Sequence, residues 1–317
     1  MLAPTRNPVK LRAMSFLAAV WPVLRRRLAQ LAVLLFGITT LLFFLVRLTG
    51  DPATIIAGET ATAEQLAAIR AFYGLDQPLV VQYLQYLANL ARLDFGMSLA
   101  ASLPALSLVT ERLVDTLVLA IAAVLGTTLV AVPLGAWLGA RPNRLASRAG
   151  AAVVFVAQGV PGYIAGLLLI QVFAVELGWL PSIGREERFS WILPAATLAA
   201  FLVPKLTRVI AANVSETMRE DYIRTAAALG ANDTAILWRH ALPNALLGAT
   251  ALLGTQFAFL FSGALTTEVI FAWPGLGRLL VNSVQTLDFA VVQASVFVVA
   301  VLVFSVNAAT DVLVRVL

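Results

Sequence analysis

The stretch DYIRTAAALGANDTAILWRHALPN, residues 221–244, is a polar segment held between two strongly apolar ones. Its pattern predicts a helix, a break and a second helix. Thr217 and Glu220 have the spacing of a capping box, and Glu220 and Arg224 are four residues apart with the acid first. Gly230 supplies a left-handed exit from the first helix. A helical loop of this kind is suited to contact a partner.

The second helix is expected to begin with Asn232 or Asp233 as its cap and to end at Leu242, just before Pro243. An ordinary solvated connector would also be polar, and composition alone favours that interpretation. The break, the Leu-Pro end and the run of alanines that begins at Ala226 argue instead for docking, because small side chains let another surface approach closely.

The composition places the rest of the chain in a lipid bilayer. Hydrophobic residues make up 60%, charged residues 12%, and the mean hydropathy is +0.90. Zero cysteines exclude a disulfide framework and any cysteine-ligated metal, and the single His240 leaves no histidine cluster. We therefore expect no metal site and no catalytic residues. The net charge of +5 is better interpreted through membrane topology than through nucleic acid.

Six apolar runs are long enough to cross the hydrocarbon core, which takes about 20 helical residues. They lie near residues 28–46, 116–138, 150–175, 192–210, 245–270 and 290–314. The chain is thus predicted to be an all-α integral membrane protein with six transmembrane helices. The first run is longer than the apolar core of a signal peptide and is interpreted as an uncleaved anchor. Either Met1 or Met14 could be the start.

Positive charges alternate between the predicted loops. Cations cluster before the first run, between the second and third, between the fourth and fifth, and at Arg315, whereas most acids lie in the other loops. By the positive-inside rule, both termini and the 221–244 loop are expected in the cytoplasm.

The predicted organisation follows from these runs: a cytoplasmic arm at 1–27, a first transmembrane helix at 28–48, an extracytoplasmic helical segment at 49–112, and a five-helix core at 113–317 that includes a cytoplasmic loop at 213–244. Helical spacing within the outer segment predicts helices over 63–73 and 80–93.

Several motifs resemble one protein family. Permease subunits of ATP-binding-cassette (ABC) importers carry E-A-A, three residues, Gly, nine residues, and I-x-L-P. The matching positions here are Arg224, Thr225, Ala226, Gly230, His240, Ala241, Leu242 and Pro243. The departures at Arg224, Thr225 and His240 look like the oligopeptide, dipeptide and nickel branch. GDP at 50–52, YGLDQPLVVQYLQYL at 73–87, LDFGMSL at 93–99 and IFAWPGLGRLL at 270–280 are similar to that branch as well, although Leu93 stands where it usually has glycine.

The resemblance implies a type I ABC importer permease fold in a bacterial inner membrane. It implies a second, homologous permease in a heterodimer, two ATPase subunits carrying ATP and magnesium, and an extracytoplasmic binding protein. The chain has no Gly-x-x-x-x-Gly-Lys-Ser/Thr loop, so ATP hydrolysis is expected on the separate subunits. Di- or oligopeptides are the expected cargo, with nickel chelates as the alternative.

Roles for individual loop residues also come from the resemblance. It implies that the helix before Gly230 docks in a groove of the ATPase. Asp221, Arg224 and Thr225 would make polar contacts there, while Ala226 and Gly230 would allow close packing. His240 is expected to have a structural role.

Polar residues within the spans are candidates for the translocation path. Gln158 and Gln256 fit either the path or interhelical hydrogen bonds, and Pro161 interrupts the third run, as in broken transporter helices. Glu268 could face the path or cap a surface turn. Lys205 and Arg208, near the end of the fourth run, are interpreted as snorkelling cations; GxxxG spacings at 135–139 and 162–166 are interpreted as packing sites.

Two other classes of membrane protein fit the sequence less well. An intramembrane enzyme would need a nucleophile with a base, or metal ligands, and these are lacking in the sequence. A secondary transporter driven by an ion gradient is the better rival, but it normally shows an internal repeat and midmembrane acids.

Overall fold

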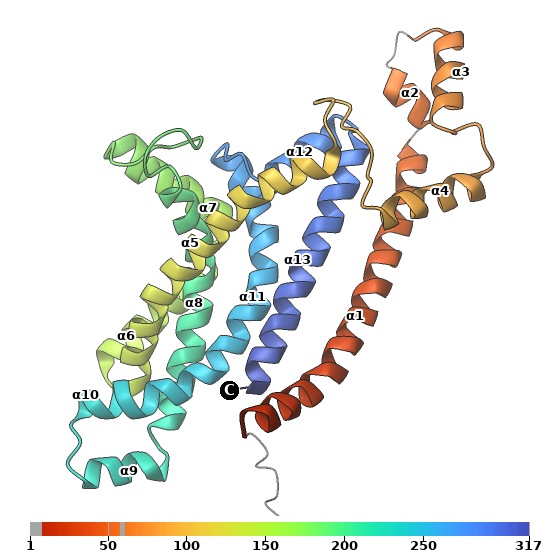
Figure 1. Cartoon of the computed structure of the whole chain (residues 1–317). Helices are drawn as coiled ribbons and strands as arrows, with labels where there is room; N and C mark the ends of the chain where they lie inside the picture. The colour runs from red at the N-terminus through yellow and green to blue at the C-terminus, as the bar shows by residue number, and fades with distance from the viewer. Residues whose placement is uncertain (1–7, 50, 58–60, 317) are drawn as a thin grey trace, which may run out of the picture. The chain divides into compact units, whose positions relative to one another are not determined.

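The computed structural model describes residues 8–49, 51–57 and 61–316 (Figure 1). All regular elements within these ranges are helices, apart from an isolated bridge between Met97 and Pro104. The first seven residues of the predicted arm, Gly50 of the GDP motif and residues 58–60 of the outer segment lie outside the described residues. Contacts divide the chain into two units, Met1–Phe95 with Val296–Val316, and Gly96–Ser295.

Four helical segments are long and apolar enough to cross a membrane: Arg25–Leu48, Ala105–Ala140, Ile192–Thr217 and Phe289–Val312. Two further pairs pass the same test together but are bent, by 101° between Leu145–Gln158 and Gly162–Glu176 and by 51° between Asp233–Phe257 and Phe259–Ile270. If each bent pair is one span, the total is the predicted six. The break predicted around Pro161 is confirmed, whereas the bend in the fifth span was not predicted.

The first unit contains α1 (Pro8–Thr49), α2 (Pro52–Ala57), α3 (Ala63–Phe72), α4 (Leu79–Ala91) and most of α13 (Phe289–Val316). The helices predicted over 63–73 and 80–93 are confirmed as α3 and α4. Thr62 and Gln65 form a reciprocal capping box at the start of α3. Helix α4 packs on α1, where the Tyr83 hydroxyl lies 2.7 Å from Thr40 Oγ1 and the Tyr83 ring lies 5.1 Å from the buried ring of Phe43.

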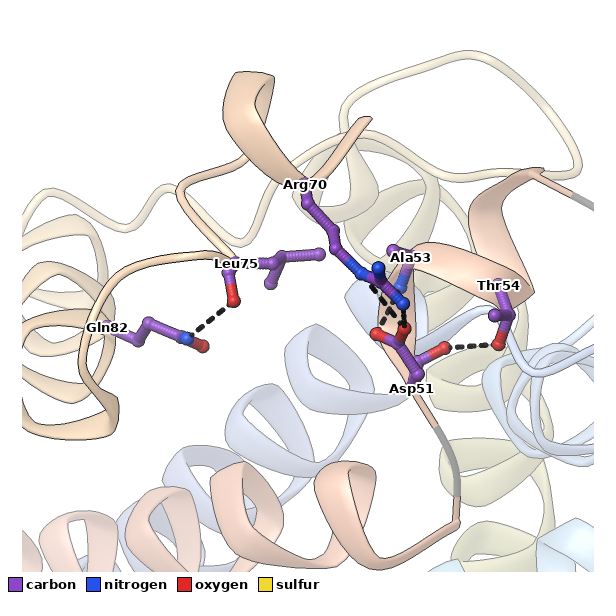
Figure 2. A network of polar contacts seen from close by, with 6 residues as sticks. All are labelled: Asp51, Ala53, Thr54, Arg70, Leu75 and Gln82. Carbon is purple, nitrogen blue, oxygen red and sulfur yellow. Dashed lines mark hydrogen bonds and ion pairs between the residues drawn. The ribbon is translucent and has the colours of Figure 1, made fainter. Parts of the chain in front are cut away.

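An ion pair ties α2 to α3 (Figure 2). Arg70 donates from Nε and Nη2 to Asp51 Oδ2, at 3.2 and 2.5 Å. Asp51 also accepts from the backbone N–H of Ala53 at 3.0 Å, and its carbonyl accepts from the Thr54 hydroxyl at 2.7 Å. The hydrogen bond from Arg70 lowers the pKa of Asp51 from its usual value.

This ion pair predicts a pH-dependent local stability. Because the pKa of Asp51 is lower in the folded chain, its stabilisation is complete above the unfolded value of about 3.9 and is lost as pH falls through the lower folded value. Hydrogen exchange of residues 51–72 should therefore be slower in the wild type than in Arg70→Met at about pH 6, and the difference should disappear near pH 2–3. Equal exchange of both proteins at about pH 6 would contradict the prediction.

The second unit is built on α5 (Ala105–Ala140), α8 (Ile192–Thr217) and α11 (Leu242–Ile270) (Figure 1). Helices α5 and α8 approach closely at one GxxxG site. A methyl group at Gly135 would lie 2.8 Å from Ile210 Cβ, and one at Gly139 would overlap the backbone of Ala211. The packing role predicted for these two glycines is confirmed. At the second site Gly166 faces Thr197, whereas Gly162 has open space around it.

Helix α5 begins earlier than the sequence indicated. It starts at Ala105, inside the segment predicted as extracytoplasmic to residue 112, and its 36 residues extend about 54 Å, beyond a hydrocarbon core of about 30 Å. Its polar first half is held by hydrogen bonds: Trp273 Nε1 donates to the Asp115 carbonyl at 3.1 Å, and the N–H of Leu276 donates to Thr116 Oγ1 at 2.8 Å. These bonds tie α5 to the segment around Trp273 and to the start of α12.

The other elements of this unit are α6 (Leu145–Gln158), α7 (Gly162–Leu169), the π-helical turn η1 (Ile170–Glu176), α9 (Asp221–Ala228), α10 (Asp233–Ala235), the π-helical turn η2 (Ile236–Ala241) and α12 (Leu276–Gln285). Helices α9 and α10 lie at one end of the unit and α12 at the other (Figure 1).

Candidate functional site

The loop at the α9 end has the predicted helix, break and helix, but its start differs from the prediction. Thr217 is the last residue of α8, and Glu220 occupies the cap position of α9 without a capping hydrogen bond from its side chain. Arg224 pairs with Asp221 at 3.1 Å, and among the described residues the expected ion pair between Arg224 and Glu220 does not form. The Thr225 hydroxyl donates to the Asp221 carbonyl at 3.0 Å, which also strengthens the first turn.

The second helix is capped as predicted but does not end as predicted. Asn232 Oδ1 accepts from the N–H of Ala235 at 2.7 Å, so Asn232 rather than Asp233 is the cap. The helix passes through η2 and continues directly into α11, with Pro243 in the first turn of α11. Proline has no backbone N–H to donate, and it is tolerated there because the first turn of a helix and the wider π-helical turn before it leave that position without a required hydrogen bond.

The break between the two helices depends on Gly230. Its φ of +90° is a backbone conformation that is strained for any residue with a side chain. No atom lies within 4 Å of a methyl group added at this position. The predicted left-handed exit is therefore confirmed, and the space beside it is open.

The apolar anchor of helix α9 is one buried side chain. Ile223 is buried against Ile236 and Ala241, and it is the buried member of α9. Apart from the half-buried Ala226, the other residues of the turn region are exposed, namely Asp221, Tyr222, Arg224, Thr225, Ala227, Ala228, Leu229 and Gly230. Leu229 is 84% exposed, so the tip of α9 combines a polar face with an uncovered apolar side chain.

His240 has a structural place in this loop. Its backbone carbonyl accepts from the Tyr222 hydroxyl at 3.4 Å and from Asn244 Nδ2 at 3.1 Å, and Asn244 also donates to the Tyr222 oxygen at 2.8 Å. Leu242, which lies two residues later in the same motif, is buried. At the first residue of α10, Asp233 pairs with Arg141 at 2.5 Å, which ties the loop to the end of α5.

Glu268, a candidate for the path, is fully buried at the α12 end. Its carboxylate accepts from Thr116 Oγ1 at 2.5 Å, from the N–H of Arg278 at 3.0 Å and from the N–H of Gly277. A methyl group at Gly275 would overlap this carboxylate. Of the two roles that the sequence allowed, these contacts are those of a cap for the turn before α12.

The two glutamine candidates each bind a cation of α8. Arg208 Nη1 donates to Gln158 Oε1 at 2.6 Å, and Lys205 Nζ donates to Gln256 Oε1 at 3.4 Å. Both cations lie farther from the helix end than the sequence indicated, because α8 continues to Thr217. Lys205 is twelve residues before that end, about 18 Å along the helix.

Close to Lys205 is a cavity of about 270 Å³ between α7, α8 and α11. It is lined by Gly162, Tyr163, Thr197, Leu198, Phe201, Phe259, Leu260, Ser262, Gly263, Thr266 and Thr267. Pro161 stands at the cap position of α7, immediately before this lining. In the described part of the chain, no three His, Asp or Glu side chains gather as a metal site.

Comparison with protein families decides the identity of the chain. A model described as "Binding-protein-dependent transport system inner membrane component" matches residues 131–317, which is more than half of the 317 residues, and a model for the amino-terminal part of the same class matches residues 20–120. The chain belongs to this family. It is a multi-pass permease of the ABC importers, as the motifs around Gly230 indicated.

Similar curated proteins point to the same family. The glutathione transport system permease protein GsiC of Salmonella choleraesuis (strain SC-B67) is 36% identical over 291 residues, covering 92% of this chain and 95% of that protein. GsiC of Escherichia coli (strain K12) is 37% identical over 289 residues, covering 91% and 94%. These matches place the permease in the peptide and nickel branch.

The fold is also found in solved structures. An inward-facing crystal form of the MetNI methionine ABC transporter has a TM-score of 0.55 at 21% identity, covering 66% of this chain and 95% of that chain. A second crystal form of MetNI gives 0.53 at 19% identity, with the same coverage. The importer permease fold is therefore confirmed.

Several residues of this permease that matter to the loop were not singled out from the sequence. Tyr222 and Asn244 join the two helices through the His240 carbonyl, and Leu229 forms the exposed apolar tip. Leu229 could have been found, since an apolar residue directly before a predicted helix-ending glycine has no helical face left to bury it. The link between Tyr222 and Asn244 depends on the continuation of the helix through Pro243, which the sequence did not indicate.

Proposed function

We propose that the permease forms half of the translocation path for di- or oligopeptides in an ATP-driven importer. The observation that carries this proposal is the α9 tip, which is anchored by Ile223 yet leaves Arg224, Leu229 and Gly230 exposed. A solvated connector would gain nothing by exposing Leu229 at the helix end. A partner that covers the tip would bury this apolar side chain favourably.

The peptide cargo is supported by the relatives. The GsiC proteins are named for glutathione, which is a small peptide with two carboxylates. These names favour a peptide over a nickel chelate. The binding protein is proposed to select the cargo, so the permease sequence carries little of the specificity.

The energy is proposed to come from two separate ATPase subunits that bind ATP and magnesium, with a second permease completing a heterodimer. In this arrangement α9 docks in a groove of one ATPase, and ATP-driven closure of the two ATPases moves both docked helices together. The anchor of α9 on Ile236 and the continuous helix from η2 into α11 would pass that motion to the spans. Both termini and α9 then face the cytoplasm, in accord with the positive-inside pattern.

The experiment is affinity purification of the tagged permease after detergent solubilisation, followed by reconstitution in liposomes. We expect two ATPase subunits and a second permease to copurify, and we expect labelled peptide uptake to require ATP and the binding protein. Uptake that follows an ion gradient in a chain purified alone would establish the secondary transporter instead. ATP-dependent uptake of a nickel chelate without peptide uptake would replace only the cargo.

A further inference from the structure

Two cations lie on one face of α8 within its apolar length. Lys205 and Arg208 are three residues apart, which places them on the same side of the helix. Each binds a neutral glutamine, Gln256 from α11 and Gln158 from the end of α6. Among the described residues, neither cation has a carboxylate within ion-pair distance. Within the described part of the chain, neither charge is therefore neutralised by a carboxylate.

Such charges are costly within a membrane. Ionisable side chains in transmembrane helices are rare and usually face the protein interior or a water-filled cavity, where they mark the route of a substrate or ion. Snorkelling explains a cation near a helix end. It does not explain the direction of the Lys205 side chain, whose Nζ is turned sideways toward α11 and donates to Gln256.

The aromatic surroundings of Lys205 connect it to the cavity. Its Nζ lies 3.6 Å from the ring centre of Phe201 and 6.0 Å from that of Phe259. Both rings also line the cavity of about 270 Å³ between α7, α8 and α11. These rings stabilise an ammonium group without neutralising it, so its charge remains available to a ligand. A polar wall of Thr197, Ser262 and Thr266 lies on the same cavity.

We propose that Lys205, at the edge of this cavity, and Arg208, three residues further along α8, form a carboxylate-binding site that receives a carboxylate of the peptide cargo during passage. The proposal rests on the proposed function for the identity of the cargo. Gln158 and Gln256 hold the two cations in place while the site is empty. A bound carboxylate accepts hydrogen bonds from Nζ and from the guanidinium and neutralises the charge, which makes the site selective for cargo with a free acid group.

The first test compares two cargoes in the complete transporter, reconstituted with its partner subunits and binding protein. Trialanine and trialanine amide differ in the carboxylate alone. Lys205→Met should lower the uptake of trialanine about ten-fold relative to the amide, since one charged hydrogen bond is lost. Lys205→Arg should restore the ratio. Arg148→Met, which removes an exposed cation of α6, is the matched control and should leave the ratio unchanged.

The second test measures binding directly. Lys10 and Lys205 are the two lysines of the sequence, so mass spectrometry can follow amine modification at each separately. N-acetyl-trialanine should protect Lys205 in the complete transporter, and its amide should not. If N-acetyl-trialanine protects Lys205 but the wild-type transporter takes up no peptide, the carboxylate site stands and the proposed cargo is overturned. Peptide uptake together with equal modification of Lys205 in the presence of either peptide would overturn the site. So would an unchanged ratio of trialanine uptake to trialanine amide uptake in Lys205→Met.

Discussion

Replacing Gly230 with tryptophan is expected to reduce ATP-driven uptake at least about thirty-fold while the permease still folds and reaches the membrane. The glycine lies beside open space, so the indole meets no atom of its own chain. It would stand instead where the proposed ATPase groove covers the α9 tip. Blocking a central contact of an interface costs about 2 kcal/mol or more, which corresponds to that reduction. Uptake in reconstituted liposomes measures the loss of transport in Gly230→Trp, and copurification of the ATPase measures the loss of docking.

Backbone strain has to be separated from bulk in this experiment. Any side chain at a φ of +90° costs about 1–2 kcal/mol, so Gly230→Ala carries the same strain with little bulk. It should keep most of the uptake. Gly178→Trp is a second control, because Gly178 also has a positive φ and open space but lies at the end of η1. Loss of ATPase copurification in Gly178→Trp, or normal uptake in Gly230→Trp, would refute the docking assignment.

The sequence predicted those features that depend on local chemistry. Gly230 was expected to leave its helix in a left-handed conformation, and Asn232 to cap the next helix, because both depend on neighbouring backbone atoms alone. The close approach at Gly135 and Gly139 followed from small residues one turn apart. The number of spans followed from apolar length, with each bent pair taken as one span.

Features that depend on distant partners were not predictable. Hydropathy falls after Ile210, so the fourth span was expected to end there, but backbone hydrogen bonds carry α8 on to Thr217. This extension turns Lys205 from a residue near the membrane edge into one well inside the helix. In the same way Pro243 reads as a helix stop, yet the π-helical turn before it lets the helix continue.

The ambiguity over Glu268 had the same origin. A carboxylate near the end of a span can face the translocation path or cap a turn. The sequence shows the span, but it does not show that the following segment folds back onto the carboxylate. The structure supplies the missing partners, which come from α5 and from the first turn of α12. Three donors converge on one buried carboxylate: the Thr116 hydroxyl, which is far away in the chain, and the N–H groups of Gly277 and Arg278, nine and ten residues after Glu268.

The second large effect is expected on stability, from Glu268→Leu. Leucine fills much of the volume but leaves Thr116 Oγ1 and the N–H groups of Gly277 and Arg278 without an acceptor in a buried place. Each unpaired donor costs about 1–3 kcal/mol. The apparent melting temperature of the purified permease should fall by about 10 °C, since each kcal/mol corresponds to about 2–4 °C for chains of about 150–250 residues and to the lower end of that range for a longer chain.

A graded series tests whether the hydrogen bonds themselves are responsible. Glu268→Gln keeps one acceptor oxygen and turns an NH₂ group toward the donors, so it should fall between the wild type and Glu268→Leu. Thr116→Val removes one of the three bonds, and Thr116→Ser should restore it. Glu186→Gln, at an exposed carboxylate, should change the melting temperature little.

The series also separates a cap from a path residue. If Glu268 holds the turn before α12, each variant that destabilises the protein should lose uptake in proportion to the folded protein recovered. Uptake per folded molecule should then stay near that of the wild type for Thr116→Val. A Glu268→Gln protein with an unchanged melting temperature but greatly reduced uptake would instead assign the carboxylate to the translocation path, since loss of a cap cannot change transport without changing stability.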